Sequence, residues 1–266
     1  MLIDFKKEPD RIKLMKKKLL LFLNSQAGIE VLEFLIKESE EIHGIFISNK
    51  SPEVDSTIKQ IASKHDLKVF SDLELLNSRE FLQDLEKNKP DFLISVYWPW
   101  LFKTELLELN LDTINFHPAL LPLNRGWYPH VHNILYGSPA GVTLHKIAIK
   151  ADSGDIWCQK KVEVFISDTA STLHKRLEEE IIALFKSKWE FIKTANIVVT
   201  PQIESNANYN KKDFVDSLDE ILLDQEYKAS EFINRLRART FGNSSYAYFR
   251  YQGKSYRIFL RIEEKE

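Results

Sequence analysis

The sequence has little cysteine, little glycine and no long apolar run, and each scarcity excludes a class of protein. Cys158 is the single cysteine among 266 residues, which rules out an intrachain disulfide and leaves no cysteine cluster for a structural zinc site. No apolar run approaches the roughly 18 residues that a membrane-spanning helix needs, and residues 1–18 lack the apolar stretch of a signal peptide. Together with a net charge of only −2, these features predict a cytoplasmic protein with no membrane association and no metal site.

The scarcity of glycine argues against a dinucleotide-dependent enzyme. The nucleotide-binding fingerprint Gly-x-Gly-x-x-Gly lets the backbone approach a pyrophosphate after the first strand of such a fold. Residues 24–28, which follow the first predicted strand, contain one glycine, Gly28. A nicotinamide cofactor is therefore unsupported, and Asn24 and Ser25 are as consistent with helix capping as with contact to a substrate.

Strands alternate with helices over the first two thirds of the chain. Residues 19–23 form an apolar run of buried-strand length, and apolar residues recur at helical spacing over residues 29–36. Further strands are predicted at residues 45–47, 68–70, 92–96 and 113–116, with helices at residues 56–64 and 79–86 between several of them. This order predicts an α/β fold with a doubly wound, mainly parallel sheet, whose sites lie beyond the carboxyl ends of the strands.

The last third of the chain predicts a smaller unit. A long helical pattern covers residues 171–193, and the Asn-rich residues 205–212, without an apolar period, are expected to be a linker or loop. A helix at residues 229–239 and two aromatic strands, at residues 246–251 and 255–262, follow it. We therefore expect a catalytic domain over residues 1–200 and a small C-terminal subdomain of one helix and a β-hairpin over residues 201–266.

Three polar residues form a candidate catalytic set. Asn115 and His117 are two residues apart, so a strand at residues 112–116 directs both side chains to one face. An amide and an imidazole can donate to an oxygen that gains negative charge when an amine attacks a formyl carbon, and the imidazole can also move a proton. Asp152 is a carboxylate that can orient the imidazole.

The spacing of several short motifs resembles the folate-dependent formyltransferase family. The matching residues are 115–118, 120–122, 125–126, 141–143 and 152–155, in order. The resemblance implies a Rossmann-like formyltransferase fold, N10-formyltetrahydrofolate as the formyl donor, and catalytic roles for Asn115, His117 and Asp152. It also implies that the pterin binds to backbone in residues 97–101 and 147–152. The donor-binding residues that it implies are Trp98, Pro99, Trp100, Leu101, Ile147, Ala148 and Lys150.

The amine acceptor is inferred from the tail of the chain. Residues 201–266 carry 11 Lys and Arg and 11 Asp and Glu, and this zero net charge disfavours a nucleic-acid partner such as transfer RNA. The paired aromatic strands, and residues 124–130, 209–213 and 233–241, resemble the N-formyltransferases that act on dTDP-linked amino-dideoxy sugars. The substrate contacts expected from this resemblance are Arg125, Lys211 and Lys212 to the diphosphate, Trp127 or Tyr209 on the base, and Tyr128 and Asn210.

Other functions stay open at this point. A different amine acceptor, such as another nucleotide sugar or methionyl-tRNA, would use the same chemistry, and a hydrolase would deformylate the folate with water. A non-catalytic folate or nucleotide binder is the third alternative, although the three candidate residues argue against it. The apolar surface of the two C-terminal strands predicts a homodimer through this subdomain. The position of the sugar amine and the sugar stereochemistry are not specified by the sequence.

Overall fold

The computed structural model describes residues 16–265, which build around one seven-stranded sheet. The strands are β1 (Lys18–Leu23), β2 (Glu41–Ile47), β3 (Val69–Phe70), β4 (Phe92–Val96), β5 (Asp112–His117), β7 (Ala140–His145) and β8 (Ile156–Val162), in the order β3-β2-β1-β4-β5-β7-β8. The first five strands are parallel, β7 is antiparallel to β5, and β8 is antiparallel to β7. The predicted doubly wound, mainly parallel sheet is confirmed.

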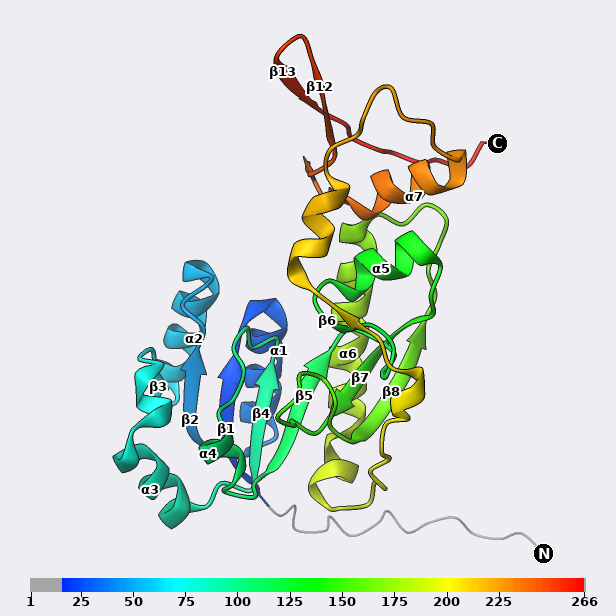
Figure 1. Ribbon diagram of the computed structural model, residues 1–266. Coiled ribbons are helices and arrows are strands. Elements are labelled where there is room, and N and C mark those ends of the chain that lie inside the picture. The colour runs from blue at the N-terminus through cyan, green and yellow to red at the C-terminus, as the bar shows by residue number, and fades with distance from the viewer. Residues whose placement is uncertain (1–15, 266) are drawn as a thin grey trace, which may run out of the picture.

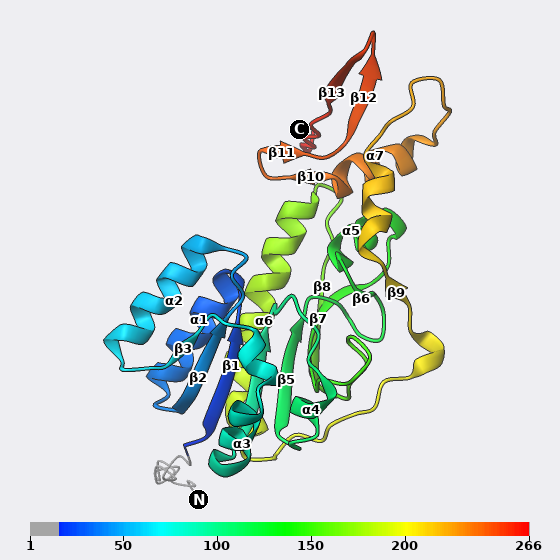
Figure 2. The same cartoon turned by 60° about the vertical axis from the view of Figure 1, so that its left-hand side comes forward.

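Helices cover both faces of this sheet (Figures 1 and 2). Alternate residues of β1 point to opposite faces, so Leu19, Leu21 and Leu23 join one apolar cluster while Leu20 and Phe22 join another. The first cluster includes residues of α1 (Ser25–Lys37), α2 (Pro52–Lys64) and α6 (Ala170–Lys193), and the second includes residues of α3 (Arg79–Asn88) and α4 (Thr104–Leu107). The one-turn helix η1 (Glu74–Asn77) precedes α3. Because β1 is buried on both faces, its sequence is a continuous apolar run and does not alternate between apolar and polar residues.

The last part of the chain forms a small unit at the top of the view in Figure 1, beyond the carboxyl ends of the parallel strands. It contains α7 (Ala229–Ala238) and the pairs β10 (Thr240–Phe241) with β11 (Ser244–Ser245) and β12 (Tyr248–Tyr251) with β13 (Lys254–Arg257). The predicted helix and hairpin are present, but the last strand ends at Arg257 rather than at residue 262. Ile258 and Leu260 instead pack against a small core that includes Ile221 and Leu236.

Two parts of the structure differ from expectation. The expected linker at residues 205–212 contains η2 (Glu204–Asn206) and the short strand β9 (Tyr209–Asn210), which pairs with β6 (Arg125–Gly126), and it leads into η3 (Lys212–Leu218). The helix α5 (Pro129–Tyr136) was not predicted, since its sequence has two histidines, an asparagine and no clear polar face. Within residues 16–265, no helix is long and apolar enough to cross a membrane.

A buried ion pair ties the end of α6 to the start of β2. Lys193 Nζ lies 2.7 Å from Glu40 Oε1, and the Lys193 and Glu40 side chains are 2% and 0% exposed. Trp189 Nε1 donates to the same carboxylate oxygen at 2.8 Å. Burial alone would lower the pKa of Lys193, but its hydrogen bonds to Glu190 and Glu40 outweigh burial and raise that pKa. The long helix is therefore held by a charge pair that depends on both partners.

Replacing Lys193 with methionine should destabilise the protein strongly. The substitution leaves the Glu40 carboxylate buried without its counter-charge, which should lower the free energy of unfolding by about 3 kcal/mol in urea denaturation. Lys175→Met on the same helix is the control, because Lys175 pairs only with the exposed Glu179 and should cost less than about 0.5 kcal/mol. Equal effects of the two substitutions would contradict the structural role of Lys193.

Candidate active site

A cavity of about 600 Å³ opens at the carboxyl ends of β1, β4 and β5. The sheet order reverses between β1 and β4, and such a switch point leaves a crevice because the connections on its two sides run in opposite directions. Asn24 after β1 and Tyr97 after β4 line the cavity together with Asn115, His117 and Asp152. The fold therefore brings the three candidate catalytic residues together in one cavity.

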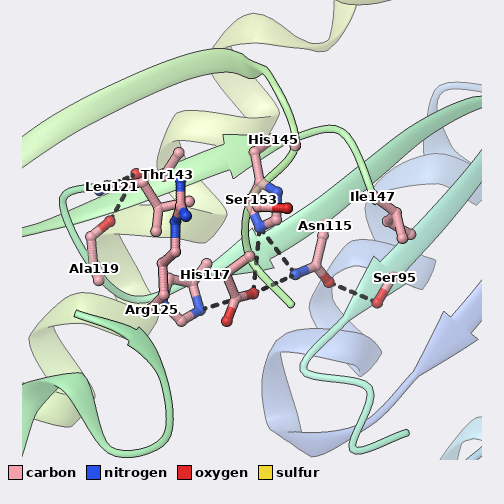
Figure 3. Close-up of polar contacts among 12 residues, drawn as sticks. Ser95, Asn115, His117, Ala119, Leu121, Arg125, Thr143, His145, Ile147 and Ser153 are labelled. Carbon is pink, nitrogen blue, oxygen red and sulfur yellow. Dashed lines mark hydrogen bonds and ion pairs between the residues drawn. The ribbon is translucent and has the colours of Figure 1, made fainter. Parts of the chain in front are cut away.

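The strand β5 directs Asn115 and His117 to the same side, as predicted (Figure 3). The hydroxyl of Ser95, on β4, donates to Asn115 Oδ1 at 2.7 Å. Asn115 Nδ2 donates to Nε2 of His145, on β7, at 3.1 Å. The neighbouring strands thus fix which end of the Asn115 amide faces the site.

His145 is a site residue that the sequence analysis missed. Its Nδ1 lies 2.7 Å from the backbone oxygen of Lys146, so the ring carries a proton on Nδ1 and offers Nε2 as the acceptor for Asn115. The antiparallel pairing of β7 with β5 places His145 directly opposite Asn115. The sequence offered a histidine at a strand end as a signal, but no pattern that pairs it with Asn115.

Asp152 lies among the other polar groups of the site. Its Oδ2 accepts from the backbone N–H of Gly126 at 2.9 Å, and its Oδ1 lies 3.5 Å from His117 Nδ1 and 3.6 Å from His145 Nε2. Burial acts to raise the pKa of Asp152, but the two imidazoles in their protonated forms and the Gly126 N–H outweigh it and hold that pKa well below its usual range. Asp152 is therefore a carboxylate across the physiological range.

Close packing fixes the loop that carries Asp152. A Cβ on Gly154 would lie 1.8 Å from the backbone oxygen of Lys146, so no other residue fits without moving the loop. The amide of Gln202 donates to the backbone oxygens of Asp152 and Gly154, at 2.9 and 2.7 Å. Asp152 itself adopts the left-handed conformation, with φ of 53°.

Burial has the largest effect on His117 and lowers the pKa of its ring below the ordinary value. Asp152 and the backbone oxygen of Asn124, 3.0 Å from Nε2, act in the opposite direction. Since Nε2 faces a carbonyl acceptor, it carries the proton in the neutral ring, which leaves Nδ1 able to accept one. When Nδ1 gains a proton, both N–H groups then face an acceptor, so the site stabilises the imidazolium that this transfer forms.

Most of the expected donor-binding residues line the cavity. Trp98, Pro99, Trp100, Leu101, Ile147 and Ala148 line the cavity, whereas Lys150 does not. The two tryptophans also differ, because Trp98 packs edge-on against Phe22 in the core while Trp100 is 40% exposed with Lys50 Nζ 4.6 Å from its ring centre. Of the two rings, Trp100 is the one free to contact a ligand.

The expected substrate contacts divide in the same way. Trp127, Tyr128 and Tyr209 line the cavity. Lys212 Nζ lies 5.1 Å from the centre of the Trp127 ring. Lys211 is exposed and does not line the cavity. These positions bring aromatic rings and one cation together at one part of the rim.

The side chains of Arg125 and Asn210 bind other residues of the chain and do not line the cavity. Arg125 is buried, and its guanidinium donates to Gln202 Oε1 at 2.7 Å and to Glu204 Oε1 at 2.7 Å. Asn210 Nδ2 donates to Asn124 Oδ1 at 3.1 Å. The expected contact of Arg125 with a diphosphate stays a prediction, and this arrangement disfavours it because the guanidinium already has partners inside the chain.

The pairing of β6 with β9 explains why Gly126 is required. Gly126 has φ of 86°, and a Cβ there would lie 2.5 Å from the backbone oxygen of Asn210. Its N–H is also the one that binds Asp152. The expected linker thus forms part of the site, because β9 holds the strand that contacts the central carboxylate.

This arrangement can move an acyl group to a nucleophile. The second N–H of Asn115 Nδ2 has only a long contact, 3.5 Å to Asp152, so it can donate to an oxygen that gains negative charge in the cavity. His117 Nδ1 can take a proton from the attacking group, with Asp152 beside it to stabilise the resulting charge. The site needs no side chain that becomes acylated.

Comparisons with known proteins agree with this chemistry. Residues 17–186 match the family model described as formyl transferase, and residues 213–264 match the one described as N-formyltransferase dimerization C-terminal domain. A methionyl-tRNA formyltransferase from Thermotoga maritima is 30% identical over 217 residues, which cover 79% of this chain and 68% of that protein. The chain belongs to the formyl transferase family, as its motifs predicted.

Solved structures of other formyltransferases share the fold. A 4-N formyltransferase from Francisella tularensis is 25% identical with a TM-score of 0.78, and the match covers 94% of this chain and 99% of that chain. An N-formyltransferase from Helicobacter canadensis, in complex with folinic acid and dTDP-3-aminofucose, is 20% identical with a TM-score of 0.67. That match covers 90% of this chain and 85% of the other.

Removing the charge of Asp152 should lower the pKa of His117 further. The carboxylate raises that pKa against burial, so in Asp152→Asn the neutral imidazole should persist to lower pH. An NMR titration of the His117 ring, assigned with a His117→Gln variant, measures the change. Asp112→Asn is the matched control. Asp112 lies on β5, the strand that carries His117, but at the other end of that strand, where it pairs with Lys146. An unchanged or raised pKa in Asp152→Asn would mean that the two side chains are not coupled.

Proposed function

We propose that the protein transfers a formyl group from N10-formyltetrahydrofolate to the amine of a dTDP-linked amino-dideoxyhexose. The observation that carries this proposal is the lining of the cavity. It combines Asn115, His117 and Asp152 with apolar residues of two segments and with aromatic rings, one of which lies beside the cation Lys212. A formyl donor and a nucleotide-linked amine can therefore meet over the three polar residues.

The donor fits the wall formed by the segments after β4 and β7. Trp100 and Leu101 expose apolar surface there, and Ile147 and Ala148 line the same cavity. A pterin is flat and polar at its edges, so it suits an apolar slot bounded by backbone groups. The complex of the Helicobacter canadensis relative with folinic acid supports a folate in this role.

The acceptor fits the part of the lining that Trp127 and Tyr209 form. Trp127 and Tyr209 are exposed aromatic rings on which a nucleotide base can stack, and Lys212 supplies a positive charge for a diphosphate. The dTDP-3-aminofucose bound to the Helicobacter canadensis relative supports this class of acceptor. Lys212 suits the diphosphate better than the buried Arg125 does.

The reaction follows from the positions of Asn115, His117 and Asp152. The amine nitrogen of the sugar forms a bond to the formyl carbon while the bond from that carbon to N10 of the donor breaks. His117 Nδ1 accepts the proton that the amine loses, and N10 regains a proton as it leaves. Asn115 donates to the formyl oxygen as its negative charge grows, and Asp152 stabilises the charged His117. Holding both reactants over these residues supplies much of the rate.

Transfer RNA is the alternative acceptor, given the relative from Thermotoga maritima. Two features favour the sugar nucleotide instead. Residues 201–266 balance 11 basic against 11 acidic residues, whereas a surface that binds the RNA backbone requires a basic excess. Residues 213–264 match a C-terminal domain described for N-formyltransferases.

An assay with a panel of acceptors tests the proposal. With N10-formyltetrahydrofolate, the protein should formylate a dTDP-3-amino or dTDP-4-amino sugar, and Asn115→Ala, His117→Ala and Asp152→Ala should each lower kcat about 10²–10³-fold. Because neutral His117 is the base, kcat/KM should fall as the pH drops through its lowered pKa. Formylation of methionyl-tRNA in preference to every sugar nucleotide would replace the proposed acceptor, and release of formate alone would indicate a hydrolase.

We also propose that two copies associate through the C-terminal subdomain. Tyr246, Tyr251, Tyr256 and Phe259 are exposed there, and an apolar surface of this extent on a small unit favours a self-complementary contact. The match of residues 213–264 to a dimerization domain supports the same surface.

The oligomeric state tests this contact. Light scattering at micromolar concentration should give twice the 31.1 kDa chain mass. Tyr251→Glu together with Tyr256→Glu should produce monomer, because charges on both sides of a twofold contact repel each other. A monomeric wild-type protein would overturn the dimer without affecting the proposed reaction.

A further inference from the structure

A second carboxylate lines the cavity that holds Asp152. It is that of Glu178, on α6, and His174 lies four residues before it on the same helix. Residues four apart lie on one face of a helix, so α6 presents both side chains to the cavity. The chemistry of Asn115, His117 and Asp152 makes no use of Glu178.

One oxygen of Glu178 is bound within the chain and the other is open. Oε1 accepts from the Ser25 hydroxyl at 3.0 Å and from the Ala27 N–H at 3.3 Å, at the start of α1. Oε2 has no hydrogen-bond donor among residues 16–265, and it is not one of the buried polar atoms there that lack a partner. Since Glu178 is half-buried and lines the cavity, a ligand in the cavity can reach Oε2.

Both oxygens of Asp152, in contrast, lie against groups of the chain. Its Oδ2 accepts from the Gly126 N–H at 2.9 Å, and its Oδ1 lies 3.5 Å from His117 Nδ1 and 3.6 Å from His145 Nε2. Glu178 is therefore the carboxylate of the cavity lining that has an oxygen available to a ligand.

The described part of the cavity lining contains no lysine or arginine that would offset this charge. Burial lowers the pKa of His130 well below its ordinary value and also lowers that of His174, so both imidazoles stay uncharged near neutral pH. Carboxylates in a cleft without cations create a negative potential, which attracts a positive ligand and repels a phosphate. Lys212, beside the Trp127 ring, lies outside this lining, so a diphosphate suits that position instead.

We propose that Glu178 binds the amine of the acceptor in its protonated form. A primary alkyl amine is mostly an ammonium near neutral pH, as the amines of proteins are. Glu178 Oε2 can accept a charge-assisted hydrogen bond from it, which is stronger than a bond from an uncharged donor. This inference rests on the proposed function and names the residue that recognises the amine.

The same contact distinguishes the substrate from the product. The ammonium gives one proton to water before it attacks the formyl carbon, and His117 takes the second proton as the new bond forms. The resulting formamide carries no charge, so its attraction to Glu178 is lost. The product therefore dissociates more readily than the substrate and leaves the cavity free for the next turnover.

Calorimetry with the substrate and its product isolates the contact. The wild-type protein should bind a dTDP-amino-dideoxyhexose more tightly than the N-formylated sugar nucleotide, and this preference should shrink as salt rises. In Glu178→Gln, affinity for the amine should fall about 10-fold, as expected for a lost charged hydrogen bond, while affinity for the formamide stays the same. Glutamine keeps an oxygen that can accept from Ser25 and Ala27, so Tm should change little.

Glu179→Gln is the matched control. It removes a carboxylate from the next position of α6, but Glu179 is exposed, pairs with Lys175 at 3.8 Å and does not line the cavity. Neither affinity should change in this variant. In steady-state kinetics, Glu178→Gln should raise KM for the sugar nucleotide and leave KM for the formyl donor unchanged, whereas Glu179→Gln should alter neither.

The outcomes separate this contact from the proposed function. If the wild-type protein formylates the sugar nucleotide but Glu178→Gln keeps the full preference for amine over formamide, the contact is wrong and the function stands. An equal loss of affinity for both ligands, or a wild-type protein with no preference at any salt concentration, also overturns the contact. Formylation in the panel assay is measured separately, and a protein that formylates no sugar nucleotide overturns both proposals.

Discussion

The half-buried carboxylate of Asp152 organises the active site. It contacts the imidazoles of His117 and His145 and the backbone N–H of Gly126, which come from three different elements. Burial alone would favour its protonated form, yet these neighbours keep it charged. The negative charge of Asp152 in turn favours the protonated form of His117. The carboxylate that binds the Gly126 backbone therefore also makes His117 a stronger base.

The segments around Asp152 are constrained because they must meet at this carboxylate. Gly154 allows its loop to lie directly on the Lys146 backbone, and Gly126 allows β6 to lie directly on β9. The C-terminal subdomain is joined to the catalytic domain, since Arg237 donates to the backbone oxygens of Asp168 and Phe165, at 2.8 and 2.6 Å, just before α6.

The sequence was sufficient for the features that depend on local patterns. Alternating strands and helices determined the parallel sheet, and the spacing of Asn115 and His117 placed both on one face. Long-range pairing could not be read in this way: β9 joins β6 only in three dimensions, and His145 meets Asn115 only because β7 is antiparallel to β5. Residue type alone could not assign a partner to Arg125, because a guanidinium suits an internal Glu204 as well as a phosphate.

Following the formyl carbon is the most direct test of the central claim. The protein is incubated with N10-formyltetrahydrofolate labelled at the formyl carbon and with a dTDP-amino-dideoxyhexose, and the fate of the label is followed by NMR. The geometry of Asn115, His117 and Asp152 predicts that the label appears in a formamide on the sugar nucleotide, and that Asp152→Ala slows its appearance by orders of magnitude. Label that appears only in free formate, or that reaches the sugar equally fast in Asp152→Ala, would contradict the account.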